Sequence, residues 1–241
     1  MDNHWFDIWS TKGRSAVEVN NDEFQAYCAL KKADGFDVAV NNETIYFMNF
    51  YKGFLASFEK MKELTGKKEF SGVFEVGCGS GVNLYLLRSR LAAGAYVGGL
   101  DYSQEMIKLA SKTLPEADLC CGDATSLPTE PKVDIVMADS VFQYFGSLEY
   151  AKQTLNKMLA KANDLVFLGE IHDAALYDEW LDNRRKTIAD YDEKYKSLKK
   201  LFFSKEWLEA VAHENGRKVC FEEIHNEEYL NSKYIFNVYF Y

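Results

Sequence analysis

Short apolar segments alternate with longer amphipathic ones through the middle of the chain. The apolar segments are of strand length and lie at 71–76, 96–100, 117–121, 133–138 and 164–171, while the stretches 82–91, 104–114 and 148–162 fit helices. Ser103 and Ser147 stand where the N-caps of the last two helices should be. Ile45 to Leu64 is a further amphipathic helix pattern, which Gly66 ends. Continuous apolar strands separated by helices indicate parallel pairing with both faces of the sheet covered. The pattern therefore predicts an α/β fold around a parallel sheet.

The pattern changes after Ile171. Asp173 to Lys200 is a charged, tyrosine-bearing helical segment, and Ser204 to Asn215 is a helix with a serine cap and a glycine stop. Two segments rich in β-formers follow, Lys218 to Ile224 and Lys233 to Tyr241. They predict a final pair of strands.

The turn after the first apolar strand is packed with glycine. The run Val73-Phe74-Glu75-Val76-Gly77-Cys78-Gly79-Ser80-Gly81 leads into an apolar helix, and Asp101 ends the next apolar strand. Glycines let the backbone turn sharply and let a ligand approach it, and the helix start offers unpaired N–H groups. A carboxylate at the tip of the neighbouring strand can accept hydrogen bonds from a ribose diol. The arrangement predicts a nucleoside site.

The glycine spacing differs from the dinucleotide fingerprint G-x-G-x-x-G, because position 82 is Val. With Glu75 two residues before Gly77, the turn resembles the first motif of the class I S-adenosylmethionine-dependent methyltransferases, E/D-x-G-x-G-x-G. The resemblance spans residues 70–171 and continues through Gly99-Leu100-Asp101-Tyr102-Ser103, Met106, Gly122-Asp123-Ala124 and Asp139. It implies a Rossmann-like, doubly wound seven-stranded sheet with a C-terminal antiparallel hairpin. It also implies S-adenosyl-L-methionine as cofactor, with S-adenosyl-L-homocysteine as product.

We expect residues 1–241 to form a single methyltransferase domain in four parts. Residues 1–45 would be an N-terminal helical lid, and 46–171 the cofactor-binding core. Residues 172–204 would be an insertion after the fifth strand that covers the substrate, and 205–241 a C-terminal helix with strands. In an open α/β sheet the ligand lies outside the carboxyl ends of the strands, where such additions can cover it.

The resemblance also implies which residues bind the cofactor. Gly77, Cys78, Gly79 and Gly81 would give backbone access to its methionine part, with Glu75 supporting the turn or reaching the ammonium group. Asp101 would bind the ribose hydroxyls. The others would be Tyr102 and Met106 flanking the adenine, Asp123 and Ala124 at its edge, and Asp139 and Ser140 beside the sulfonium. The structural alternatives are an ordinary strand-to-helix turn, a solvated Asp101, a core Met106 and an Asp123 that only caps a turn.

Two residues near the end of the fifth strand are candidates for the catalytic base. His172 lies close to the strand tips, and the usual pKa of histidine suits proton removal. Glu170, two residues earlier, competes for this role. A histidine at a strand end is more often structural, so that alternative stays open.

The substrate would be recognised by the additions to the core. Arg184, Tyr191 and Tyr195 belong to a basic, tyrosine-rich stretch that suits an anionic or polyhydroxyl molecule. A solvated helix face is the alternative for this stretch. Near the start, Trp9 and Arg14 belong to an aromatic and basic cluster that could fold over the cofactor, and Tyr144 follows the fourth strand.

Composition narrows the class of protein further. The formal charge is −9, with 37 acidic and 28 basic residues, which disfavours a nucleic-acid partner. Five cysteines without C-x-x-C spacing indicate a reduced, cytoplasmic protein and no metal site. No secretion signal or membrane-spanning run is expected, so no membrane partner is either. The apolar C-terminal strand leaves a homodimer open.

Together these features predict a methyltransferase that acts on oxygen, less readily on nitrogen, of a small polar or anionic metabolite. Sugars and phosphorus-containing compounds are among the acceptors considered. Two rivals remain. An aminopropyltransferase would need a second acid beside Asp139, which the residues after it do not supply. A non-catalytic S-adenosylmethionine-binding regulatory protein would carry the same cofactor motifs.

Overall fold

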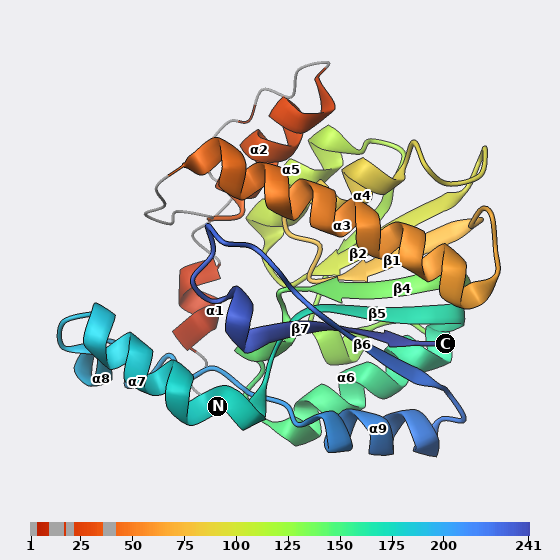
Figure 1. Cartoon of the computed structure of the whole chain (residues 1–241). Helices are drawn as coiled ribbons and strands as arrows, with labels where there is room; N and C mark the ends of the chain where they lie inside the picture. Colours follow the sequence, from red (N-terminus) through yellow and green to blue (C-terminus); the bar gives the residue numbers. More distant parts are fainter. Residues whose placement is uncertain (1–3, 10–16, 18–21, 36–41) are drawn as a thin grey trace.

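The fold is built on one sheet of seven strands (Figure 1). The computed structural model describes residues 4–9, 17, 22–35 and 42–241. The strands are β1 (Gly72–Val76), β2 (Tyr96–Asp101), β3 (Asp118–Cys121), β4 (Val133–Asp139), β5 (Ala162–His172), β6 (Val219–Glu223) and β7 (Ile235–Phe240). Their order is β3-β2-β1-β4-β5-β7-β6. The first five pair in parallel, and β7 runs antiparallel to both β5 and β6. The predicted doubly wound sheet with a C-terminal antiparallel hairpin is confirmed.

The helices of the chain cover both faces of this sheet. They are α1 (His4–Trp9), α2 (Glu23–Ala33), α3 (Glu43–Thr65), α4 (Val82–Leu87), α5 (Gln104–Thr113), α6 (Leu148–Lys161), α7 (Tyr177–Thr187), α8 (Tyr191–Lys194) and α9 (Lys205–Glu214). Figure 1 shows the long α3 crossing one face of the sheet, with α6 and α9 on the opposite side. Among the described residues, no helix is both long enough and apolar enough to cross a membrane.

Alternation along the strands divides the core into two layers. Val73, Ile135 and Phe167 pack with side chains of α2, α3 and α4. Their strand neighbours Phe74 and Val136 belong to the layer under α6 and α9. The inner strands β1, β4, β5 and β7 bury both of their faces and are largely apolar in sequence, whereas the edge strands β3 and β6 are only partly buried.

Local capping explains where several helices begin. Ser103, Ser147 and Ser204 each accept a hydrogen bond from the backbone N–H three residues later, as serine caps do. The caps at Ser103 and Ser147 had been expected from the sequence. The helix expected over 82–91 ends earlier, at Leu87, and the strand expected over 164–171 begins at Ala162 and ends at His172.

A β-bulge interrupts the pairing of β5 with β7. Leu168 faces Val238 and Ile171 faces Phe236, so three steps on β5 match two steps on β7. Glu170 lies inside this bulge with a φ of 55°, in the left-handed region. The extra residue shifts the alternation, because Leu168 and Ile171 both pack in the layer under α6 and α9. Glu170 is thereby turned toward the face that α3 covers.

Candidate functional site

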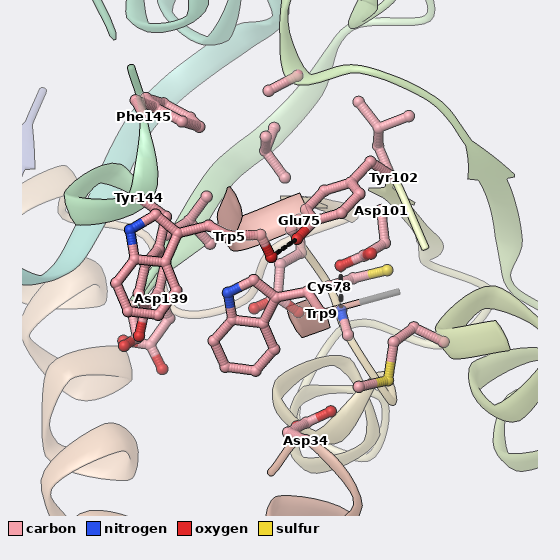
Figure 2. Close-up of a pocket in the computed structure, with 18 of the residues that line it drawn as sticks. Trp5, Trp9, Asp34, Glu75, Cys78, Asp101, Tyr102, Asp139, Tyr144 and Phe145 are labelled. Carbon is pink, nitrogen blue, oxygen red and sulfur yellow. Dashed lines mark hydrogen bonds between the residues drawn. The ribbon is translucent and has the colours of Figure 1, made fainter. Parts of the chain in front are cut away.

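A cavity of about 590 Å³ lies at the carboxyl ends of β1, β2 and β4 (Figure 2). This is the point where the strand order reverses, since β1 has β2 on one side and β4 on the other. We call it the glycine-turn cavity. Of the residues predicted to bind a cofactor, all except Gly81 line it: Glu75, Gly77, Cys78, Gly79, Asp101, Tyr102, Met106, Asp123, Ala124, Asp139 and Ser140.

The glycine turn is shaped by positions that a larger residue could not occupy. Gly77 and Gly79 have φ angles of 73° and 52°. A Cβ at Gly77 would overlap Val141, and one at Gly79 would lie 2.7 Å from the Asp34 Oδ1 atom. Gly81, with a φ of 80°, instead begins α4 and packs against Leu114. The turn thus presents bare backbone to the cavity.

Asp101 is fixed in place by the turn and by its own strand end. Its Oδ2 atom accepts a hydrogen bond from the Gly79 N–H at 3.0 Å, and its Oδ1 atom accepts one from the Ser103 N–H at 2.8 Å. Burial raises the pKa of this carboxyl. Each carboxylate oxygen can accept more than one hydrogen bond, so the group keeps acceptor capacity toward the cavity.

The residues predicted around an adenine ring line the same cavity. Tyr102 donates a hydrogen bond from its hydroxyl to the Trp5 carbonyl at 3.3 Å, and Met106 lies in the first turn of α5. Asp123 accepts hydrogen bonds from the Thr125 N–H and hydroxyl, so it caps a turn as well as lining the cavity. The two readings of Asp123 from the sequence are therefore compatible.

Three aromatic rings cover the cavity from the side of α1. The Trp5 and Trp9 rings lie 4.7 and 5.3 Å from the ring of Tyr144, centre to centre. Trp5 also donates from its indole N–H to the Lys199 carbonyl at 3.1 Å. We call Trp5, Trp9 and Tyr144 the aromatic cap; all three line the cavity (Figure 2). Arg14, predicted in the same cluster, lies outside the described residues.

A buried polar network underlies the methionine end of the predicted site. The Asn83 amide donates to Glu75 Oε1 at 2.8 Å and to Asp139 Oδ2 at 3.1 Å, and the Lys31 ammonium lies 3.7 Å from Asp139 Oδ2. Among the described residues, Glu75 Oε2 and Asn83 Oδ1 have no hydrogen-bond partner. Burial raises the pKa of Glu75 well above its usual range.

Asp34 supports the glycine turn from α2. It accepts hydrogen bonds from the Ser80 N–H at 2.7 Å and from the Ser80 hydroxyl at 3.0 Å. The sequence reasoning missed Asp34, Lys31 and Asn83. The first two reach the site through the packing of α2 on α4, which no local motif encodes. Asn83 could have been found as a polar residue in an otherwise apolar helix start, two residues after the last glycine of the turn.

A second cavity, of about 220 Å³, lies under α3. We call it the α3 cavity. Lys31, Asn83 and Asp139 line both this cavity and the glycine-turn cavity. Glu170 also lines the α3 cavity. Burial, and then the charge of Asp139, raises the pKa of Glu170 to about 7, against the opposing effects of Lys31 and the Ser140 hydrogen bond.

His172 has different surroundings. It is buried, its Nε2 atom lies 3.5 Å from the Lys200 ammonium, and Phe202 packs edge-on against its ring. Burial and the Lys200 charge hold its pKa well below the usual range, so the ring is neutral. His172 lines neither of the two cavities described above.

The predicted substrate residues of the insertion form a cluster of their own. The rings of Tyr191 and Tyr195 stack 4.8 Å apart, with the Arg184 guanidinium about 6 Å from each. These three residues line neither cavity. Lys200, 5.5 Å from the Tyr144 ring centre, lies between this side of the molecule and the aromatic cap.

The glycine turn and the strand tips around it match a known family. A family model described as a methyltransferase domain covers residues 73–163, from β1 to the start of β5. The part of the chain from β1 to the start of β5 is therefore a methyltransferase domain. Among curated relatives, it is 35% identical over 97 residues to a malonyl-[acyl-carrier protein] O-methyltransferase of Priestia megaterium. That match covers 39% of this chain, and the chain spans only 35% of the relative's length.

Other matches to the methyltransferase domain extend further along the chain. An uncharacterized methyltransferase of Bacillus cytotoxicus is 25% identical over 199 residues, which is 80% of this chain and 90% of that protein. A solved magnesium protoporphyrin IX methyltransferase from Synechocystis, with bound S-adenosylhomocysteine, superposes with a TM-score of 0.61 at 17% identity. The superposed region covers 85% of this chain and 88% of the Synechocystis protein. The predicted family and fold class are confirmed, and the cofactor expected is the one that such neighbours hold.

Proposed function

We propose that this protein binds S-adenosylmethionine in the glycine-turn cavity and transfers its methyl group to a small polar acceptor. The observation that carries the proposal is the joining of the glycine turn and the Asp101 carboxylate in one cavity of about 590 Å³. The residues fit the cofactor: two glycines leave backbone bare where a Cβ would clash, and the buried Oε2 atom of Glu75 has no partner within the described chain. A cationic ammonium would satisfy such an acceptor.

Each part of the cofactor has residues suited to hold it. Asp101 would accept from the ribose hydroxyls, Tyr102 and Met106 would flank the adenine, and Asp123 with Ala124 would lie at its edge. The turn Gly77–Gly79, with Glu75, would take the methionine part, and Asp139 and Ser140 would lie nearest the sulfonium. When bound, the cofactor supplies a methyl group already activated on cationic sulfur.

The chain's own work is to orient the reactants, exclude water and remove a proton where the acceptor needs it. The aromatic cap covers the cavity and limits water access. Of the two predicted bases we favour Glu170, because it lines a cavity that shares three residues with the cofactor site and its pKa of about 7 suits proton removal. His172 lines neither cavity and is not favoured as the base.

The names of the relatives and structural neighbours cover several kinds of methyl acceptor. The relatives' names include carrier-protein and uncharacterized methyltransferases, and the solved neighbours include amino pentose and plantazolicin enzymes. These names support a methyl group, and not an aminopropyl group, as the group that is transferred. The five cysteines are free, which is in keeping with a reducing, cytoplasmic setting.

Calorimetry tests the cofactor site directly. We expect S-adenosylhomocysteine to bind the wild-type protein and Asp101→Ala to bind it at least about tenfold more weakly, because hydrogen bonds to a charged acceptor contribute roughly 1.5–3 kcal/mol each. Asp101→Asn keeps an acceptor oxygen for one of the two backbone N–H groups and is the more conservative variant. Glu116→Ala, an exposed position outside the cavity, is the control. Normal binding by the folded Asp101→Ala protein would contradict the assignment.

A further inference from the structure

We infer that the α3 cavity holds the methyl acceptor and that the acceptor presents a protonated amine to Glu170 and Asp139. This inference rests on the proposed function and names the acceptor class for it. The α3 cavity is walled by α3, by the ends of β5 and β6, and by β7. It meets the glycine-turn cavity at Lys31, Asn83 and Asp139, so a ligand there would lie next to the methionine end of the cofactor site.

The charges around the α3 cavity favour a cation. Asp139, Glu170, Glu222 and Glu223 line it, against Lys31 and His225. Lys60 offsets Glu222, since their charged groups lie 3.2 Å apart. Asp139 and Glu170 share Lys31, with the Lys200 charge acting on Glu170 as well, and Asp139 lies at the junction with the cofactor site. An anionic acceptor would meet repulsion there, while a positive charge would be favoured.

Unpartnered polar atoms supply a second, independent argument. Asn226 is 5% exposed, and its Nδ2 donor has no partner among the described residues, although its Oδ1 atom accepts from Asn49 at 3.1 Å. Asn83 is 4% exposed, and its Oδ1 acceptor at the junction is likewise unpaired within the described chain. Buried polar groups of this kind normally have partners, because leaving one unpaired is unfavourable.

These atoms specify different groups on the ligand. Asn83 Oδ1, with the carboxylates of Asp139 and Glu170, calls for N–H donors at the junction. Asn226 Nδ2 calls for an oxygen acceptor, such as a hydroxyl, further along the cavity. Phe50, Phe54 and Phe167 provide apolar wall between them. A small hydroxylated amine satisfies the whole set.

Glu170 then has a defined task. The bound ammonium passes one proton to the Glu170 carboxylate, which becomes a neutral carboxylic acid, and the nitrogen keeps its electron pair as a neutral amine. That pair is what a methyl acceptor needs. The bulge that turns Glu170 to this face of the sheet places the carboxyl among the residues that wall the cavity.

Matched probes test the charge preference. The protein is saturated with S-adenosylhomocysteine and titrated by calorimetry with glucosamine, glucose and glucuronate, which share a skeleton and differ in charge. We expect glucosamine to bind at least about tenfold more tightly than the other two, as roughly 1.4 kcal/mol of charge interaction gives. Equal or tighter binding of glucuronate, or binding of none of the three, overturns the inference.

Variants of cavity residues test whether glucosamine binds in the α3 cavity. Glu170→Gln should lose the preference for glucosamine, whereas Glu206→Gln, exposed on α9 on the other face, should keep it. Gly53 lines the α3 cavity and has open space where a Cβ would lie, so Gly53→Trp should obstruct the cavity and abolish glucosamine binding. S-adenosylhomocysteine affinity should be unchanged in Gly53→Trp. Glucosamine binding that survives in Gly53→Trp overturns the inference. Failure of the wild-type protein to bind S-adenosylhomocysteine would instead refute the proposed function.

Discussion

Single side chains at the strand tips determine what the site can do. Asp101 and Asp139 end parallel strands, Glu170 lies two residues before the end of β5, and each is buried or nearly so. Ser140 and Glu170 both have left-handed backbone, with φ angles of 58° and 55°. Such conformations are costly for residues other than glycine and tend to occur at functional positions. The two outliers lie on neighbouring strand ends, joined by the Ser140 N–H donating to the Gly169 carbonyl at 3.1 Å.

Glu170 makes folding stability depend on pH. Its pKa is raised from 4.5 to about 7, chiefly by burial, so the folded state holds a proton that the unfolded chain has released. The stabilisation is fully present below the unfolded value and is lost as pH rises through about 7. Asp34, raised by burial to about 7, acts in the same direction. His172, whose pKa is lowered, acts in the opposite direction and favours folding at higher pH.

Comparison of wild type with Glu170→Gln isolates the carboxyl. We expect the free energy of unfolding in urea to fall less between about pH 5 and about pH 8 in the variant, by roughly 2–3 kcal/mol. His172→Gln should change the dependence of the unfolding free energy on pH in the opposite direction. Identical pH profiles for wild type and Glu170→Gln would show that Glu170 titrates normally.

Two glycines should respond in opposite ways to alanine. A Cβ at Gly169 would overlap Asp139 Oδ1, while a Cβ at Gly53, in the middle of α3, would meet nothing within 4 Å. We expect Gly169→Ala to destabilise by about 1–2 kcal/mol and to weaken S-adenosylhomocysteine binding, because Asp139 is held by Asn83. Gly53→Ala should stabilise by up to about 1 kcal/mol. Thermal and urea unfolding measure both, and similar effects at the two positions would contradict the clash.

Among the secondary-structure elements, those with strong periodicity could be predicted and those placed by distant contacts could not. Continuous apolar runs located all five parallel strands, and serine caps located the starts of α5 and α6. The bulge in β5 has no local signature, so the turn of Glu170 toward α3 was unforeseen. The sequence analysis looked for a second acid beside Asp139 only among the residues that follow it. In the structure that acid is Glu170, which comes from β5.

The residues that line the glycine-turn cavity were predictable because they belong to contiguous motifs. Those of the α3 cavity were not, since Lys31 comes from α2, Asn49 from α3 and Asn226 from the segment after β6. These residues are brought together only by the packing of α2 and α3 over the sheet. The sequence also predicted that Arg184, Tyr191 and Tyr195 bind the substrate. In the structure they cluster with one another beside α7 and line neither cavity.

The aromatic cap gives α1 a measurable role. Tyr144→Ala removes ring contacts to both Trp5 and Trp9, each worth about 0.5–1.5 kcal/mol. We expect faster hydrogen exchange in α1 and S-adenosylhomocysteine dissociation at least several-fold faster. Tyr177→Ala, a half-exposed ring outside the cavity, is the control. A dissociation rate that Tyr144→Ala leaves unchanged would mean that the cap does not retain the cofactor.

The molecule as a whole carries a formal charge of −9, which should attract cationic ligands. S-adenosylmethionine carries one more positive charge than S-adenosylhomocysteine. We expect its association rate, followed by stopped-flow tryptophan fluorescence, to fall several-fold from about 0.02 to about 0.5 M salt. The rate for S-adenosylhomocysteine should change little. Equal salt dependence for the two ligands would exclude steering by the net charge.

The bond from the Trp5 indole to the Lys199 carbonyl joins positions 194 residues apart in the chain. During synthesis α1 leaves the ribosome long before Lys199, so its docking partner emerges only after most of the sheet has been made. α1 is therefore made early and docks late. Until it docks, Tyr144 lacks its two tryptophan neighbours and this side of the glycine-turn cavity stays uncovered.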